Sequence, residues 1–122
     1  MKHTKEFENL CEDAKKNVNE VSVEEVMKKL DAGERFHFLD CREDHEWEKG
    51  RCKGSKHLSR GIIERDIANL VAQKDDEIVV YCGGGYRSAL ACESLQKMGY
   101  RNIYSMAGGI RKWRENDLPE ES

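Results

Sequence analysis

The chain has 122 residues, which is the material of one domain, and its hydrophobic (38%) and charged (37%) residues are nearly equal in number. With a formal net charge of -3, it lacks the excess of Lys and Arg that general binding to nucleic acid requires. No apolar run approaches the ~20 residues that span a bilayer, and residues 1–20 lack the apolar stretch of a signal peptide. We therefore expect a cytoplasmic protein without nucleic-acid or membrane partners.

Helical spacing and capping residues predict the first elements. Apolar residues within 4–18 recur at helical spacing and predict an amphipathic N-terminal helix. Ser22 followed by Glu25 has the pattern of a capping box, which begins a second helix, and Gly33 is suited to end it. The segments that follow are predicted to be a strand over 35–40, a surface helix over 43–49 and largely loop over 51–61.

The second half of the chain alternates between helices and strands. Apolar spacing predicts a helix over 62–71, and the continuous apolar run 78–81 is typical of a strand buried on both faces. After residues 82–88 comes a helix that Gly99 ends. A short strand over 103–105 and a last helix after Gly108-Gly109 complete the order. This alternation predicts one α/β domain with parallel strand pairing.

The segment from Cys82 to Ser88 joins the buried strand to the helix that follows it. In an open α/β sheet, ligands bind at the carboxyl ends of strands. The glycines at 83–85 let the backbone turn its N–H groups inward, and such a ring at a helix N-terminus binds anions. A cysteine inside it would have a lowered pKa and act as a nucleophile, with Arg87 as a fixed positive charge. The alternative is a glycine-rich turn in which Cys82 is a small buried hydrophobe.

Residues 80–88 resemble the active-site loop of the rhodanese (thiosulfate sulfurtransferase) family, and the likeness extends across about residues 21–119. The resemblance implies a small, mostly parallel central sheet flanked by helices on both faces. It divides the chain into an N-terminal helical extension over 1–20, the rhodanese-like domain over 21–119 and a tail over 120–122. The other matching segments are 38–42 with Glu46-Trp47, 57–61, 99–104 and 108–119 with Trp113. The chain departs from the family at 51–53 and at Cys41, where a valine-like residue is usual.

The resemblance also implies the chemistry of the site. Cys82 would carry a sulfane sulfur as a persulfide, taken from a thiosulfate-like donor and passed to cyanide or a thiol in a ping-pong scheme without metal or cofactor. Arg60 would bind an anionic donor, or else be a solvated surface arginine. Four residues separate Cys82 from Arg87, whereas cysteine-dependent phosphatases have five, which disfavours phosphatase or arsenate reductase activity. The substrate-binding residues would be Gly83, Gly84, Gly85, Tyr86, Arg87, Ser88 and Arg60.

A second class of function stays open: a binding module, or a sulfur carrier that is loaded by a partner protein. Cys82 and Arg87 are both present, which argues against an inactive module. The amphipathic segment 4–18 would suit docking or dimerisation. A protein sulfur donor or acceptor is therefore an alternative partner to a small molecule.

The remaining cysteines are expected to be thiols, because cytoplasmic proteins rarely hold disulfides. Cys11 and Cys92 are expected to pack in the interior, with Cys92 alternatively a resolving thiol for Cys82. Asp40 and Arg42 are expected to form a structural ion pair near a strand end. The chain has no paired C-x2-C motif. We therefore expect no zinc site from the candidate ligands Cys41, His45, Cys52 and His57.

Overall fold

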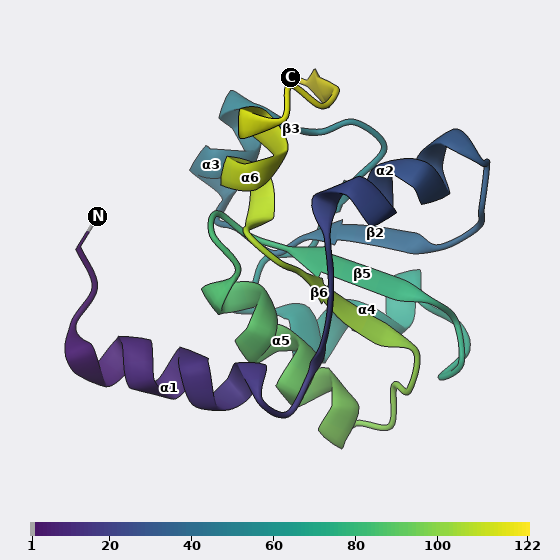
Figure 1. Ribbon diagram of the computed structural model, residues 1–122. Helices are drawn as coiled ribbons and strands as arrows, with labels where there is room; N and C mark the ends of the chain where they lie inside the picture. Colours follow the sequence, from purple (N-terminus) through teal and green to yellow (C-terminus); the bar gives the residue numbers. More distant parts are fainter. Residues whose placement is uncertain (1) are drawn as a thin grey trace.

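Five parallel strands form the central sheet of the computed structural model, which describes residues 2–122. Outside this sheet, two short strands pair antiparallel, β3 (Arg51–Cys52) with β7 (Glu120–Glu121). The expected α/β domain with a mostly parallel sheet is confirmed. In spatial order the sheet strands are β1 (Asn19–Val21), β6 (Ile103–Met106), β5 (Ile78–Tyr81), β2 (His37–Asp40) and β4 (Lys56–His57) (Figure 1).

Strand β5 lies at the centre of the sheet, between β6 and β2, and all four of its residues are buried. This position explains its continuous apolar sequence, since side chains on both faces of a covered sheet lie in the core. Its last residue, Tyr81, lies opposite Asp40, the last residue of β2. The chain therefore leaves β2 and β5 side by side at the carboxyl edge of the sheet.

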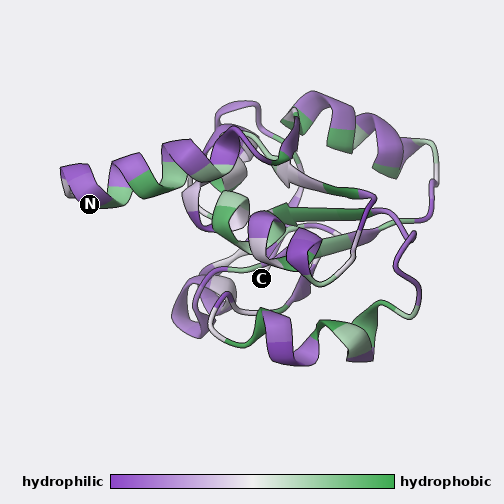
Figure 2. Cartoon of the chain, turned by 90° about the horizontal axis from the view of Figure 1, so that it is seen from below, coloured by the Kyte–Doolittle hydropathy of each residue, from purple (hydrophilic) through white to green (hydrophobic). Residues whose placement is uncertain are grey.

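Helices cover both faces of the sheet. On one face, α4 (Ile63–Leu70) and α5 (Tyr86–Lys97) bury apolar side chains against Leu39 and Val80. On the other, α2 (Val23–Asp31) and α6 (Gly109–Glu115) pack against neighbouring strand residues such as Phe38. Figure 2 shows hydrophobic residues on the central strands and more hydrophilic residues on the outer helices. Within residues 2–122, no helix combines the length and apolar character needed to cross a bilayer.

The second helix begins and ends where the sequence predicts. Glu25 N donates to Ser22 Oγ at 3.0 Å, and Ser22 N donates to Glu25 Oε1 at 3.1 Å, which completes the capping box of α2. Gly33 follows the helix at φ +69°, a conformation that glycine adopts without strain. The short helix α3 (Asp44–Lys49), also expected, follows β2.

The N-terminal helix α1 (Lys5–Lys15) packs along α5 and buries Cys11 and Ala14 (Figure 1). Short strands lie at both ends of the domain predicted over 21–119. Residues 19–21 form β1 of the sheet, and the first two of them lie in the segment 1–20 expected as the extension. Residues 120–121, expected as a tail, pair with β3. The segment 51–61, expected as loop, contributes the two-residue strands β3 and β4.

Candidate active site

Cys82 follows β5 directly at the carboxyl edge of the sheet, and its side chain is almost entirely buried. The loop at 83–85 leads into α5 through Gly85, whose φ of +104° favours glycine. The loop is also tied to α6: Ile110 N donates to Cys82 O at 2.9 Å, and Arg111 N donates to Gly83 O at 3.0 Å. A Cβ at Gly109 would overlap both of these carbonyl groups, so this close approach requires glycine.

Hydrogen-bond donors surround the sulfur of Cys82. Gly85 N lies 3.2 Å and Ser88 N 3.4 Å from Sγ, and Ser88 Oγ lies 3.5 Å from it. Ser88 Oγ is held in turn by Ser105 Oγ at 2.8 Å. The Cys41 thiol, Ser88 and the Gly85 amide together hold the pKa of Cys82 well below its ordinary value, although burial opposes them. These contacts therefore favour the thiolate form of Cys82.

Arg87 does not bond to the sulfur; it forms a two-pronged ion pair with Glu46 of α3. Its Nη1 and Nη2 lie 2.7 and 3.1 Å from the two carboxylate oxygens. The hydrogen bond to Arg87 lowers the pKa of Glu46 to about 2, and the same bond raises the pKa of Arg87. A Cβ on Gly83 would lie 3.2 Å from Arg87 Nη2, so the guanidinium lies against the loop. Arg87 thus supplies charge beside the loop and fixes the loop to α3.

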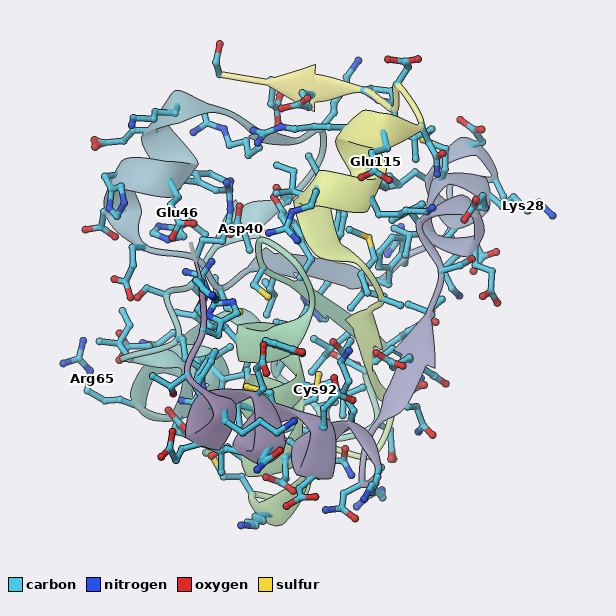
Figure 3. All side chains as sticks on the ribbon, turned by 60° about the vertical axis from the view of Figure 1, so that its left-hand side comes forward. Lys28, Asp40, Glu46, Arg65, Cys92 and Glu115 are labelled. Atoms are coloured by element: carbon cyan, nitrogen blue, oxygen red, sulfur yellow. The ribbon has the colours of Figure 1, made fainter. Side chains whose placement is uncertain are left out.

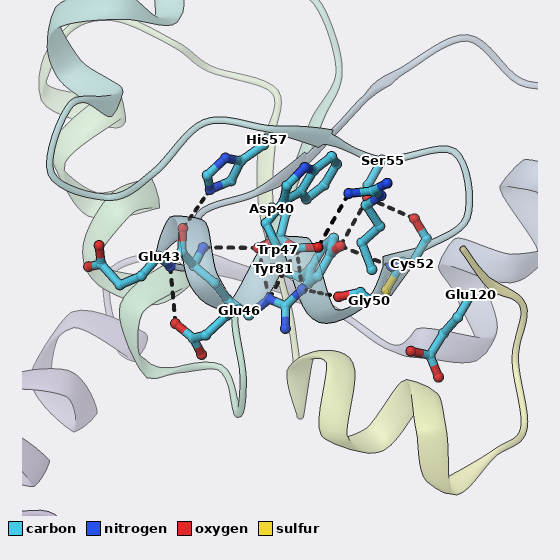
Figure 4. A network of polar contacts seen from close by, with 12 residues as sticks. Asp40, Glu43, Glu46, Trp47, Gly50, Cys52, Ser55, His57, Tyr81 and Glu120 are labelled. Atoms are coloured by element: carbon cyan, nitrogen blue, oxygen red, sulfur yellow. Dashed lines mark hydrogen bonds and ion pairs between the residues drawn. The ribbon is translucent and has the colours of Figure 1, made fainter. Parts of the chain in front are cut away.

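A buried ion pair between Arg42 and Asp40 contacts the end of α3. The Arg42 guanidinium donates to both carboxylate oxygens of Asp40, with Nη2 at 2.7 Å, and to Gly50 O at 2.6 Å (Figure 4). Both side chains are nearly inaccessible to solvent. The ion pair expected from the sequence is therefore confirmed, and its contacts join the end of β2 to the end of α3. Figure 3 shows Glu46 and Asp40 on this same side of the molecule.

A cavity of about 700 Å³ opens above Cys82. Helix α1 forms part of its wall, since Phe7 packs edge-on against Tyr86 with ring centroids 5.9 Å apart. Tyr86 Oη also donates to Glu12 Oε2 at 3.1 Å, so its side chain points to α1 and only its backbone belongs to the loop. The lining residues are His3, Phe7, Glu8, Lys15, Glu43, His45, Glu46, Cys82, Gly83, Gly84, Tyr86, Arg87 and Arg111.

Arg60 and Arg111 differ in whether they reach the cavity beside Cys82. Arg60 does not line the cavity, because its guanidinium donates to Glu64 Oε2 at 2.8 Å, and Ser94 holds the same oxygen. Arg111 lines the cavity beside the loop: a Cβ on Gly84 would lie 3.3 Å from its Nη1. Among residues 2–122, no carboxylate pairs with Arg111. No sequence pattern marks this residue as part of the site, although it lies two positions after the Gly108-Gly109 pair.

The structure separates the candidate zinc ligands. Cys41 lies in the core on the α5 face of the sheet, and Cys52 lies in the core on the α6 face. His57 stacks on Trp47 with ring centroids 5.1 Å apart. Within residues 2–122, no group of three or more His, Cys, Asp or Glu side chains is placed to hold a metal ion. All five cysteines are buried free thiols, and Cys11 and Cys92 pack in the interior as expected.

Comparison with known proteins agrees with the family resemblance noted in the sequence. The family model of the rhodanese-like domain matches residues 22–116. A sulfurtransferase of Allochromatium vinosum is 30% identical over 102 residues, which are 84% of this chain and 94% of that protein. YrkF of Bacillus subtilis, proposed by its name to be a sulfur carrier protein, is 32% identical over 97 residues, which are 80% of this chain. The chain spans about half (51%) of the length of YrkF.

Among solved structures, the polysulfide-sulfur transferase homodimer of Wolinella succinogenes superimposes with a TM-score of 0.80 and 30% identity. The match covers 95% of this chain and 87% of that one. It therefore reaches beyond the 22–116 segment that the family model matches.

Proposed function

This chain belongs to the rhodanese-like domain family, and on that basis we propose that it is a sulfurtransferase whose nucleophile is Cys82. The observation that carries the proposal is the ring of donors around the Cys82 sulfur, which stabilises an anion at the end of β5. The sulfurtransferase and sulfur carrier names of its relatives support the same chemistry. The five buried free thiols further favour a reducing, cytoplasmic setting.

In the first half-reaction, the donor is thiosulfate or a similar anion. The Cys82 thiolate attacks the outer sulfur, a new S–S bond forms, and the S–S bond of the donor breaks. Sulfite leaves with the bonding electron pair, so Cys82 becomes a persulfide. The Gly85 and Ser88 amides, with the Ser88 hydroxyl, stabilise the negative charge of this persulfide.

The donor is an anion, and the cavity offers it positive charge. Arg111 lines the cavity without a carboxylate partner within residues 2–122, whereas the charge of Arg87 is shared with Glu46. We therefore assign donor binding to Arg111 rather than to Arg60, whose guanidinium is engaged by Glu64 outside the cavity. Arg87 has a positioning role: it holds the loop and adds to the field at the sulfur.

In the second half-reaction, a nucleophilic acceptor takes the outer sulfur and restores the Cys82 thiolate. Cyanide would give thiocyanate, and a thiol would give a new persulfide. The scheme is ping-pong and uses no metal or organic cofactor. The alternative to a small molecule is a protein that donates or accepts the sulfur. The sulfur carrier name of the relative YrkF supports this alternative.

The test is intact mass after a brief reaction. Reduced protein is mixed with thiosulfate, quenched within seconds and weighed. We expect a gain of one sulfur atom, roughly 32 Da, that cyanide removes as thiocyanate. Cys82→Ser should show neither result, while Cys92→Ser, which changes a cysteine outside the cavity lining, should behave as the wild type. Folded wild-type protein that gains no sulfur would contradict thiosulfate use and favour a carrier loaded by a partner.

A further inference from the structure

A second cysteine, Cys41, lies directly beside Cys82. Each follows the last paired residue of its strand, and the register pairs Asp40 with Tyr81, so Cys41 and Cys82 are neighbours across adjacent parallel strands. The hydrogen bond from Cys41 N to Tyr81 O, at 2.9 Å, continues the strand pairing to this point. Adjacent strands lie about 4.8 Å apart, which is within the range of about 4.4–6.8 Å between Cα atoms that a disulfide spans.

The two side chains also point to the same face of the sheet. Side chains alternate along a strand, and both cysteines lie in the core cluster that contains Leu39 and Val80 from the same strands. The Cys41 thiol is the main hydrogen-bond partner that lowers the pKa of Cys82, and its own pKa is raised well above the ordinary value by the same bond. The two side chains therefore interact as a dithiol pair, in which the thiolate form is favoured at Cys82 and the protonated form at Cys41.

The other cysteines do not have this relationship to Cys82. Cys52 lies on the opposite face of the sheet, where its amide donates to Tyr81 Oη. Cys92 and Cys11 come from helices, and burial is the main cause that raises their pKa values, with no hydrogen bond to Cys82.

Resting on the function proposed above, we propose that Cys41 is a resolving thiol that discharges the Cys82 persulfide as sulfide and leaves a Cys41–Cys82 disulfide. The Cys41 sulfur attacks Sγ of Cys82, a new S–S bond forms, and the bond from Sγ to the outer sulfur breaks. The Cys41 proton moves to the departing sulfur, which leaves as HS⁻. The outer sulfur is reduced by two electrons, and the two cysteine sulfurs are oxidised by one each.

The position of the pair favours this displacement. Cys82 lines the cavity, whereas Cys41 is fully buried and does not. The attacking sulfur therefore comes from the interior, and the leaving sulfur departs on the cavity side. Because no cavity surface reaches Cys41, an external thiol or dithiol can only regenerate the pair by attack on the Cys82 sulfur. The activity would convert a sulfane-sulfur donor and two thiol equivalents into sulfide, in addition to sulfur transfer.

The test follows mass and sulfide together under anaerobic conditions. Fully reduced wild-type protein receives one equivalent of thiosulfate and no acceptor. We expect the early adduct of roughly 32 Da to decay to a species about 2 Da lighter than the starting protein, as a disulfide requires. About one equivalent of sulfide should be released, and peptide mapping should join Cys41 to Cys82. The same protein without thiosulfate should stay fully reduced, which excludes oxidation by air.

Two variants isolate the resolving step. Cys41→Ser and Cys41→Val should release no sulfide. They should still form the sulfur adduct and pass its sulfur to cyanide, but more slowly than the wild type, because the Cys41 thiol lowers the pKa of Cys82. Cys92→Ser, a cysteine of the same core cluster, should release sulfide as the wild type does. The valine variant preserves apolar packing if serine disturbs the fold. A stable adduct on wild-type protein, or equal sulfide release from the Cys41 variants, would overturn the proposal. Absence of any adduct in all variants would instead count against the sulfurtransferase function itself.

Discussion

Arg87 and Glu46 face each other beside the loop at 83–85, with two hydrogen bonds of 2.7 and 3.1 Å that join α5 to α3. The arginine of the loop is thus engaged by the protein itself rather than directed at the sulfur. Both side chains are about 30% exposed, so the ion pair is partly shielded from solvent. The ion pair holds the loop in place as well as supplying charge. Its contribution to the stability of the fold can be measured separately from activity.

Glu46→Gln tests this ion pair through stability. The folded-state pKa of Glu46, about 2, lies below its ordinary value of 4.5. The pair therefore contributes stability above about pH 4.5, which is lost as the pH falls from there toward 2. We expect the variant to lose about 1–2 kcal/mol of unfolding free energy at pH 7. Denaturant unfolding of both proteins at pH 7 and pH 3 checks this, and an equal difference at both pH values would contradict it.

Ser88→Ala tests the activation of the thiolate. The variant removes the hydroxyl 3.5 Å from Sγ but keeps the Ser88 amide, so the pKa of Cys82 should rise while the nucleophile remains. One lost hydrogen bond of about 1 kcal/mol corresponds to about a fivefold slower alkylation at a pH below the pKa. The rate of alkylation by iodoacetamide against pH gives the shift. Ser105→Ala removes the hydroxyl that is hydrogen-bonded to Ser88 Oγ and should move the same profile less.

Arg111→Ala tests donor binding. Loss of the cavity arginine that has no carboxylate partner within residues 2–122 should raise KM for thiosulfate about tenfold, equivalent to about 1.4 kcal/mol, with a smaller effect on kcat. Arg60→Ala is the matched control, because Arg60 pairs with Glu64 away from the cavity. Steady-state thiocyanate formation measures both variants. A larger KM effect from Arg60 than from Arg111 would restore the assignment that the sequence suggested.

Phe7→Ala tests the part of α1 that walls the cavity. Without the ring that packs on Tyr86, the cavity should widen, and Cys82 should react several-fold faster with a bulky maleimide while its reaction with iodoacetamide changes little. Leu10→Ala changes an exposed residue of the same helix and is the control. Parallel changes in both reagents would mean that the substitution alters the sulfur itself rather than access to it.

The sequence predicted the centre of the molecule better than its edges. Strand β5 and the loop after it were predictable because a continuous apolar run and three glycines are strong local signals. Strand β1 was not, since Asn19 and Glu20 are exposed and their strand exists through pairing with β6. The two-residue strands β3, β4 and β7 likewise depend on partners that no local pattern reveals.

The candidate site shows the same division. The placement of Cys82 and the donors of the loop followed from the order strand, glycines, helix. The direction of the Arg60 side chain could not be foreseen, because it pairs with Glu64 in the first turn of α4, outside which Arg60 itself lies. The approach of Arg111 depends on how α6 meets the loop. The contact of Cys41 with Cys82 depends on strand register, which an isolated sequence does not specify.

The bonds from Ile110 and Arg111 to the carbonyls of Cys82 and Gly83 have a consequence for biosynthesis. They tie the loop to a segment that lies about 30 residues further along the chain. While the ribosome still holds that segment, we expect Cys82 to lack these contacts and to behave as an ordinary thiol. We therefore expect the thiol to become reactive only after α6 has docked, and truncated chains to carry no activated cysteine.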